Sequence, residues 1–148
     1  KSYELYELCK QTINYYSTVT DLTDCIATWK SLQGNSEVDQ ALKHEEAIWQ
    51  QEASLKQSYM QSIQTQDLNW WKKDITVLNQ KIKTDKDKEE AFMFARVLDY
   101  LSLGCYMQTS SAMKQNNMQA ADFFSQLYII VDPTNKEAIK FREELEKK

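Results

Sequence analysis

The sequence predicts an all-α protein, organised as a single domain over residues 1–148. Two glycines and one proline among 148 residues are too few for the turns of a β-rich fold. Apolar residues recur three and four positions apart through most of the chain, which is the period of one face of an α-helix. Polar segments with helix-capping residues separate these stretches. We therefore expect antiparallel helical hairpins, about six helices in all, stacked as a short α-α superhelix.

The first predicted helix covers residues 2–32. Its apolar stripe steps by three and four residues and contains one polar member. The stripe comprises Leu5, Leu8, Thr12, Tyr15, Val19, Leu22, Ile26 and Trp29. The β-branched residues around Val19 weaken the helix locally, so we expect a kink there, with Asp21 as the cap of a restart. Gly34 is expected to end the helix in the left-handed conformation.

The three cysteines, Cys9, Cys25 and Cys105, lack the spacing of a zinc site. On one continuous helix, Cys9 and Cys25 would lie ~24 Å apart along the axis, too far to form a disulfide with each other. Apolar residues flank each cysteine, so we expect buried, reduced thiols that pack as small hydrophobic groups. The alternative is a single bridge between Cys105 and the first helix.

Two further helices are predicted over residues 36–64 and 67–83. Ser36 is expected to cap the first of them, whose apolar stripe is thin and has Glu52 on or near it. Protein should cover only half of such a helix, which leaves the other side for solvent or a partner. Asp67 is expected to cap the second, whose stripe is regular. That stripe is Leu68, Trp71, Ile75, Leu78 and Ile82.

Residues 88–113 are apolar over a wide arc, which indicates a central helix with neighbours on two sides. Its inner stripe is Ala91, Phe94, Leu98, Leu101 and Cys105, and its second stripe is Phe92, Ala95 and Tyr106. Gly104 inside this helix costs ~1 kcal/mol relative to alanine, so we expect a close helix crossing there. Residues 117–131, apolar almost all round, should form a buried helix. Residues 134–147 should form a one-sided terminal helix that covers the open end of the stack.

The turn around Pro133 echoes a turn one structural unit earlier in the chain. Thr134 and Glu137 have the spacing of a capping box, and Pro133 discourages helix at the residue before it. In this repeat Asp85 corresponds to Asp132. Asp87 and Glu90 correspond to Thr134 and Glu137, and Ala91-x-x-Phe94 corresponds to Ala138-x-x-Phe141. An internal repeat of this kind predicts stacked helical units.

Three features of the C-terminal half are similar to a known repeat family. They are the polar turn at 114–117, the small residues Ala120 and Ala121 before Phe123 and Phe124, and the closing turn at 131–135 with its Asp-Pro pair. With these features, residues 65–148 resemble a tetratricopeptide helical hairpin. The unit here is near 48 residues rather than 34, and Leu103-Gly104 lies about four positions too early for the family pattern. The resemblance, to a longer and degenerate repeat, implies a scaffold that binds proteins or peptides on a concave face.

The sequence contains no recognisable catalytic pattern. His44 is the only histidine, so a second histidine ligand for a diiron site is missing, and His44 is the one histidine base for a Cys or Ser nucleophile. Gly34 and Gly104 are isolated, which excludes a glycine-rich phosphate loop. We therefore expect a protein that is not an enzyme and has no cofactor or metal. His44-Glu45-Glu46 should lie on a solvated helix face.

Aromatic residues outside the core stripes are the remaining functional candidates, because exposed Trp and Tyr are enriched where partners bind. Trp70 points about 100° away from Trp71, which belongs to a core stripe. Trp49 lies at the edge of a thin stripe, and Tyr16 lies beside a stripe residue. The predicted partner-binding residues are Trp70, Trp49, Tyr16 and Tyr59. The alternative for Trp70 is packing against a neighbouring helix pair.

Charge and hydropathy restrict the class of partner. The net charge of −4 gives no basic surface for nucleic acid, and no apolar run reaches the ~20 residues of a membrane span. A protein or peptide partner is therefore expected. Two alternatives stay open: self-assembly through the stripe of residues 2–32 as a coiled-coil seam, and a small apolar ligand between helices. The lining expected for that ligand is Met93, Met107, Met113 and Met118.

The chain begins at Lys1 rather than Met. Removal of a signal peptide or lipoprotein leader would explain this start, and so would truncation of a longer chain. We favour an exported protein, periplasmic or membrane-anchored after leader removal, with the cytoplasm as the alternative.

Overall fold

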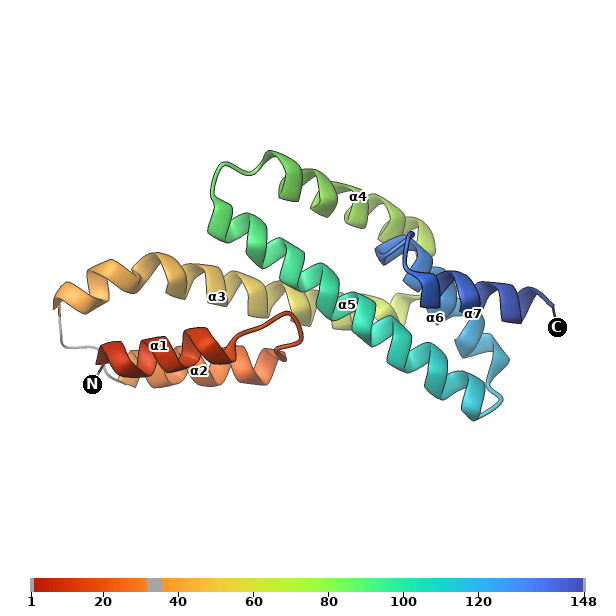
Figure 1. The fold of residues 1–148 in the computed structure, drawn as a ribbon, viewed down its shortest axis with the longest axis horizontal. Helices are drawn as coiled ribbons and strands as arrows, with labels where there is room; N and C mark the ends of the chain where they lie inside the picture. Colours follow the sequence, from red (N-terminus) through yellow and green to blue (C-terminus); the bar gives the residue numbers. More distant parts are fainter. Residues whose placement is uncertain (1, 32–35, 148) are drawn as a thin grey trace.

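The computed structural model describes the backbone of residues 2–31 and 36–147, and this part of the chain is helical without a β-strand (Figure 1). The α-helices are α1 (Ser2–Thr12), α2 (Val19–Ser31), α3 (Ser36–Ser62), α4 (Leu68–Thr84), α5 (Lys88–Lys114), α6 (Met118–Val131) and α7 (Lys136–Glu146), and a 3-10 turn, η1 (Ile63–Thr65), follows α3. The predicted all-α class is confirmed. The described residues form seven α-helices rather than about six, because the first predicted helix is divided.

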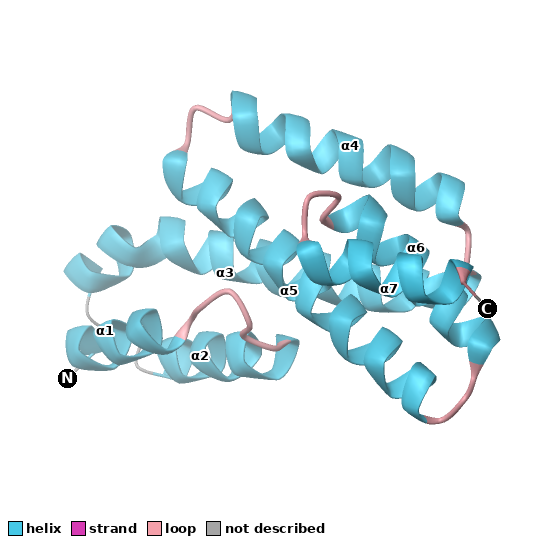
Figure 2. Cartoon of the chain, turned by 45° about the vertical axis from the view of Figure 1, so that its right-hand side comes forward, coloured by secondary structure: helices cyan, strands magenta, loops and turns pink. Residues whose placement is uncertain are grey.

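Each helix packs against helices that are near it in the chain (Figures 1 and 2). The antiparallel pair α1–α2 lies against α3, and α5 packs on α3 and α4, with α6 beside α5 and α7 on α6. The main core is built from residues of the five helices α3 to α7. Its fully buried members include Trp71, Met93, Val97 and Leu127. A smaller cluster joins Ile26 to Trp49 and attaches the N-terminal pair to α3. No helix in the described part of the chain has the length and hydrophobicity to cross a bilayer.

The prediction of one helix over residues 2–32 is wrong, because local hydrogen bonds end α1 before the expected kink. The Asn14 backbone N–H donates to Ser17 Oγ (2.8 Å), and Asn14 Oδ1 accepts from the Tyr16 backbone N–H (2.8 Å). Such side-chain bonds offer the backbone an alternative to helix. Thr18 and Asp21 then form a reciprocal capping box, with bonds of 2.9 and 3.1 Å, which starts α2. The chain therefore reverses where one long helix was expected.

This reversal changes the relation of the cysteines. Cys9 of α1 and Cys25 of α2 lie on adjacent antiparallel helices, and their thiols are near enough to interact electrostatically. The expected ~24 Å separation is therefore wrong. All three cysteines are free thiols in this structure. Cys25 and Cys105 are buried, as expected, whereas Cys9 is only half-buried. Burial raises the pKa of each of the two buried thiols to about 12.

The caps of the later helices follow the sequence with one exception. The Asp67 side chain accepts from Trp70 N–H, and that of Asp87 from the first amides of α5, as expected. The predicted Thr134 capping box is wrong. Asn135 caps α7 instead, and its Oδ1 accepts from the N–H groups of Glu137 and Ala138. The expected helix end at Gly34 lies outside what the structure describes. Ser36, the expected cap of the next helix, is the first residue of α3, and its side chain is outside the description.

The two echoed aspartates occupy equivalent places. Asp85 and Asp132 are the C-cap residues of α4 and α6, and their N–H groups donate to Lys81 O and Tyr128 O, respectively. Asp132 also accepts hydrogen bonds from the side chains of Ser102 (3.0 Å) and Asn135 (2.9 Å), and so joins α5 to the start of α7. The echo therefore marks where two helices end.

Gly104 does not lie at a close helix crossing, contrary to the prediction. A Cβ built there would meet no atom outside its own helix within 4 Å. As expected for a central helix, α5 has neighbours on more than one side, because it packs on α3, α4, α6 and α7. Of its second stripe, Tyr106 is 39% exposed and packs against Phe141 of α7, with 5.7 Å between ring centres, whereas Phe92 is 60% exposed and borders the surface described next.

Candidate partner-binding groove

One face of α3 and one face of α5 line a groove. From α3 the groove has Glu45, Trp49 and Met60, followed by Ile63 of η1, and the buried Glu52 and Lys56 lie on the same side of the helix. From α5 it has Glu89, Phe92, Arg96, Tyr100, Leu103 and Met107. Steps of three and four residues place each set on one side of its helix. The two helices run in the same direction and cross obliquely near their middles (Figure 1). We refer to this surface as the α3–α5 groove.

The α1–α2 loop, residues 13–18, crosses the groove and divides it into two pockets. The Lys56 ammonium donates a hydrogen bond to the carbonyl oxygen of Ser17 and holds the loop in place. Tyr15 lines the pocket on one side of the loop, and the next residue, Tyr16, lines the pocket on the other side. Each pocket thus has walls from α3, α5 and the N-terminal pair.

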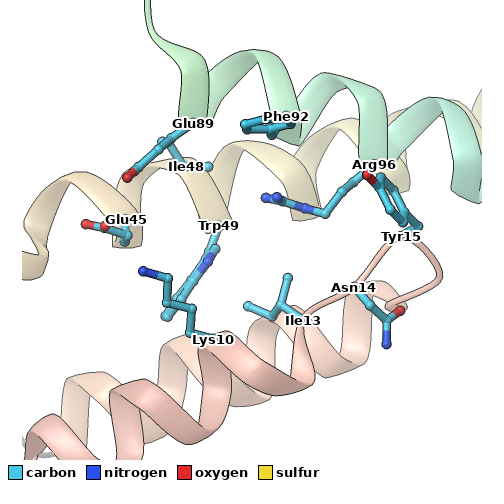
Figure 3. Close-up of a pocket in the computed structure, with 10 residues that line it drawn as sticks. All are labelled: Lys10, Ile13, Asn14, Tyr15, Glu45, Ile48, Trp49, Glu89, Phe92 and Arg96. Carbon is cyan, nitrogen blue, oxygen red and sulfur yellow. The ribbon is translucent and has the colours of Figure 1, made fainter.

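The first pocket, here called the charged pocket, has a volume of about 430 Å³ (Figure 3). Its lining is Lys10, Ile13, Asn14, Tyr15, Glu45, Ile48, Trp49, Glu89, Phe92 and Arg96. Figure 3 shows Lys10 of α1 and Ile13, the residue after α1 ends, extending toward Trp49, while Phe92 and Arg96 come from α5. Two cations and two carboxylates therefore surround an aromatic surface, an arrangement suited to a ligand with both polar and apolar parts.

A buried charge cluster joins α3 to α5 beside the charged pocket, which its member Arg96 lines. Glu52 Oε1 accepts from Arg96 Nε (2.9 Å) and Nη2 (2.6 Å), and Glu52 Oε2 lies 3.1 Å from Lys56 Nζ. The side chains of Glu52 and Lys56 are both completely buried. The Lys56 ammonium also lies 4.6 Å from the centre of the Tyr100 ring. Burial lowers the pKa of Lys56, and the Glu52 carboxylate opposes that shift.

The second pocket, here called the apolar pocket, has a volume of about 390 Å³ and a largely hydrophobic lining. Tyr16 and Met107 are each 58% exposed at its edge, and Met60 is 48% exposed. Gly104 lines it from α5, where the missing side chain leaves open space. Phe124 and Leu127 of α6 contribute to the far wall. The pocket is suited to an aliphatic or aromatic group.

The four sequence-predicted partner-binding residues do not lie together. Tyr16 lines the apolar pocket, and Trp49 lines the charged pocket, although Trp49 is only 5% exposed. Trp70 and Tyr59 lie in a separate cleft of about 100 Å³ between α3 and α4. There Trp70 is 39% exposed and packs edge-on against Tyr59 and Trp71.

Tyr59 is a core residue of the α3–α4 contact. It is 4% exposed, stacks on Trp71 at 5.2 Å between ring centres, and donates its hydroxyl hydrogen to Asp74. Burial and this hydrogen bond raise the Tyr59 pKa. Of the four methionines expected to line a ligand site, Met107 borders the apolar pocket, whereas Met93 is completely buried in the main core.

Sequence reasoning missed Lys56, Arg96, Phe92 and Met60 as residues of the groove. One signal was present: Glu52 and Lys56 are four residues apart on the apolar stripe of α3, which is the spacing of a helical ion pair. A charged pair on a stripe that faces the core indicates buried, paired charges. Their partner Arg96 is 44 positions from Glu52 in the sequence, so no helical spacing connects it with the pair.

His44 has a more specific contact than a solvated helix face. Its Nε2 atom lies 2.8 Å from Asp87 Oδ2, so α3 touches the N-cap of α5, although the His44 side chain is 58% exposed. Within the described residues, no three side chains among His, Cys, Asp and Glu are grouped to hold a metal ion. Comparisons with protein families, with curated proteins and with solved structures found no match to this chain.

Proposed function

We propose that this chain is a non-catalytic interaction module that binds a peptide segment of another protein in the α3–α5 groove. The observation that carries the proposal is the position of the exposed apolar residues. Five of them border the two pockets: Tyr15, Tyr16, Met60, Phe92 and Met107. Apolar side chains concentrated in a concave surface and left open to water are typical of protein-binding sites.

The groove chemistry favours an amphipathic peptide as the occupant. An apolar side chain of the peptide would enter the apolar pocket beside Gly104, while its polar groups would face Lys10, Arg96 and the two carboxylates of the charged pocket. Because the charged pocket carries both signs of charge, it would orient the bound peptide rather than attract it by net charge. The buried Glu52–Lys56–Arg96 cluster would hold the walls in place before the peptide arrives, which lowers the entropic cost of binding.

The packing order of the helices supports the proposed tetratricopeptide-like stacking. From α3 onward each helix packs against the next helix but one, as α3 does with α5, α4 with α6, and α5 with α7. Helical hairpins stacked in a superhelix produce this order and leave one continuous surface for a ligand. In this proposal the α3–α5 groove is part of that surface, and the α7 helix covers the C-terminal end.

A random peptide library displayed on phage tests the proposal, because the selection requires no identified partner. Peptides selected on the wild-type chain should carry an apolar anchor and should bind Met107→Ser at least about tenfold more weakly. Ile139→Ser is the matched control, because Ile139 on α7 is 41% exposed and lies away from both pockets. Peptides that lose affinity equally with both variants, or with neither, would contradict binding in the groove.

A small apolar ligand in the apolar pocket is the second candidate, favoured by that pocket's hydrophobic lining. Native mass spectrometry of the purified chain would then show a bound small molecule that is absent from Gly104→Leu. Self-assembly as a coiled coil has less support, because the stripe of residues 2–32 is divided between α1 and α2. The same spectra report a dimer directly if the chain associates with itself.

A further inference from the structure

The reversal between α1 and α2 brings two cysteines from different helices close together. Cys9 lies near the end of α1 and packs against the cluster of Ile26 and Trp49, and Cys25, in the middle of α2, directly precedes Ile26. The two thiols are near enough to interact electrostatically. The two helices run side by side and antiparallel (Figures 1 and 2). We infer that Cys9 and Cys25 are a redox-active dithiol that closes to an intramolecular disulfide linking α1 to α2.

The two thiols differ in their access to solvent. Cys25 is 8% exposed, and its burial, its interaction with Cys9 and the nearby carboxylates of Asp21 and Asp24 all raise its pKa. Cys9 is half-buried and packs against the Ile26–Trp49 cluster, with part of its surface open to solvent. Cys9 is therefore the thiol that meets an external oxidant, and Cys25 is the thiol that resolves the product.

The oxidant is a low-molecular-weight disulfide such as oxidised glutathione. The Cys9 thiolate attacks one glutathione sulfur, which forms a mixed disulfide and releases one glutathione thiolate that takes a proton from water. Cys25 then loses its proton and attacks Cys9 Sγ, which forms the intramolecular bond and releases the second glutathione. The protein loses two hydrogen atoms and is oxidised, while oxidised glutathione gains them and is reduced.

Cys105 is not part of this pair. It is 4% exposed and belongs to the main core on α5, whereas Cys9 packs on the separate N-terminal cluster. The disulfide would connect residues sixteen positions apart and enclose the loop that borders both pockets of the groove. Oxidation would therefore fix the N-terminal wall of the groove, whether or not the groove binds a peptide.

The test is to incubate the folded chain with oxidised glutathione, alkylate the remaining thiols, and map the cysteines by peptide mass spectrometry. The inference predicts one Cys9–Cys25 linked peptide, an intact mass lower by two hydrogens, and an alkylated Cys105. Cys25→Ser should instead retain one glutathione on Cys9, while Cys105→Ser should form the same Cys9–Cys25 bond as the wild type. In denaturant, where the fold no longer holds Cys9 and Cys25 together, disulfides should form between all pairs of the three cysteines.

Two results would overturn the inference. One is a stable glutathione adduct on Cys9 of the folded wild-type chain without conversion to the internal disulfide. The other is a linked peptide that contains Cys105 in the folded chain. Circular dichroism of each variant shows whether it has the helical content of the wild type, so the wild-type mapping decides the question even if a variant fails to fold.

Discussion

The buried charge cluster gives the sharpest prediction for stability. Glu52 is the single anion between two cations, and it is completely buried with three polar contacts of 2.6–3.1 Å. Glu52→Gln keeps the size of the side chain but removes the negative charge that neutralises Lys56 and Arg96. Removing one partner of a buried ion pair costs about 3–5 kcal/mol, because the remaining charge is left uncompensated. We expect Glu52→Gln to lose that amount of unfolding free energy.

Lys56→Met should cost less, although it changes a residue that is equally buried. The variant leaves Glu52 paired with Arg96. It removes one of the two cations that face this single carboxylate. Its main loss is the hydrogen bond to the Ser17 carbonyl, about 1–2 kcal/mol for a buried acceptor left without a donor. The double variant Glu52→Gln/Lys56→Met should therefore be more stable than Glu52→Gln alone.

Urea unfolding followed by far-ultraviolet circular dichroism measures these differences. The matched control is Glu146→Gln, the same chemical change in an exposed pair 3.5 Å from Arg142 on α7. Exposed pairs contribute about 0–1 kcal/mol, so the control should unfold close to the wild type. The reasoning is refuted if Glu52→Gln costs no more than Glu146→Gln, or if Lys56→Met is the more damaging of the two buried changes.

Single substitutions at three other positions also have defined outcomes. Gly104→Ala should raise the unfolding free energy by about 1 kcal/mol, because it improves helix propensity where a Cβ meets nothing; a loss in the same urea experiment would contradict the open site. Thr18→Ala should cost about 1 kcal/mol by removing the cap of α2, measured as a lower urea midpoint. Partial desolvation and the Asp132 carboxylate raise the pKa of Asp99, although its side chain is exposed, so its ionisation disfavours the fold modestly as the pH rises above the unfolded-state value of about 3.9. Asp99→Asn should therefore raise the melting temperature at about pH 7 and have little effect near pH 3; an equal effect at both pH values would contradict the assignment.

The sequence predicts the extent of a helix well where the spacing of apolar residues and the capping residues agree. The extents of α4 to α7 follow from regular apolar steps and from capping residues such as Asp67 and Asp87. At the start of α7 two neighbouring residues were both good caps. Asn135 was selected over Thr134, and its side chain also donates to Asp132, a contact that follows from the turn geometry.

The division between α1 and α2 was hidden because the apolar stripe continues through it. Period alone favours one helix across residues 13–18, while the Asn14 and Ser17 side chains favour a turn by bonding to nearby backbone groups. The difference between these two outcomes is a few local hydrogen bonds and the packing of Ile26 on Trp49. Such tertiary contacts are not visible in the spacing of apolar residues.

The groove could be predicted only in part for the same reason. Of its α5 wall, Phe92 belongs to a stripe predicted from the sequence, and its other walls come from α3 and from the loop that reverses the N-terminal chain. Aromatic content pointed to Tyr16 and Trp49, which line the groove, and also to Tyr59, which is buried by Trp71. Composition identifies candidate residues, and the packing of helices decides which of them reach the surface.

The central claim is that the α3–α5 groove is the binding surface, and Gly104 allows its most direct test. Gly104→Leu should place a bulky side chain in the apolar pocket, whereas Gly104→Ala adds a single methyl group to the same open space. Isothermal titration calorimetry with a peptide selected on the wild-type chain should give an affinity at least about tenfold lower for Gly104→Leu and nearly unchanged for Gly104→Ala. Equal affinities for the wild type and both variants would show that the partner binds elsewhere.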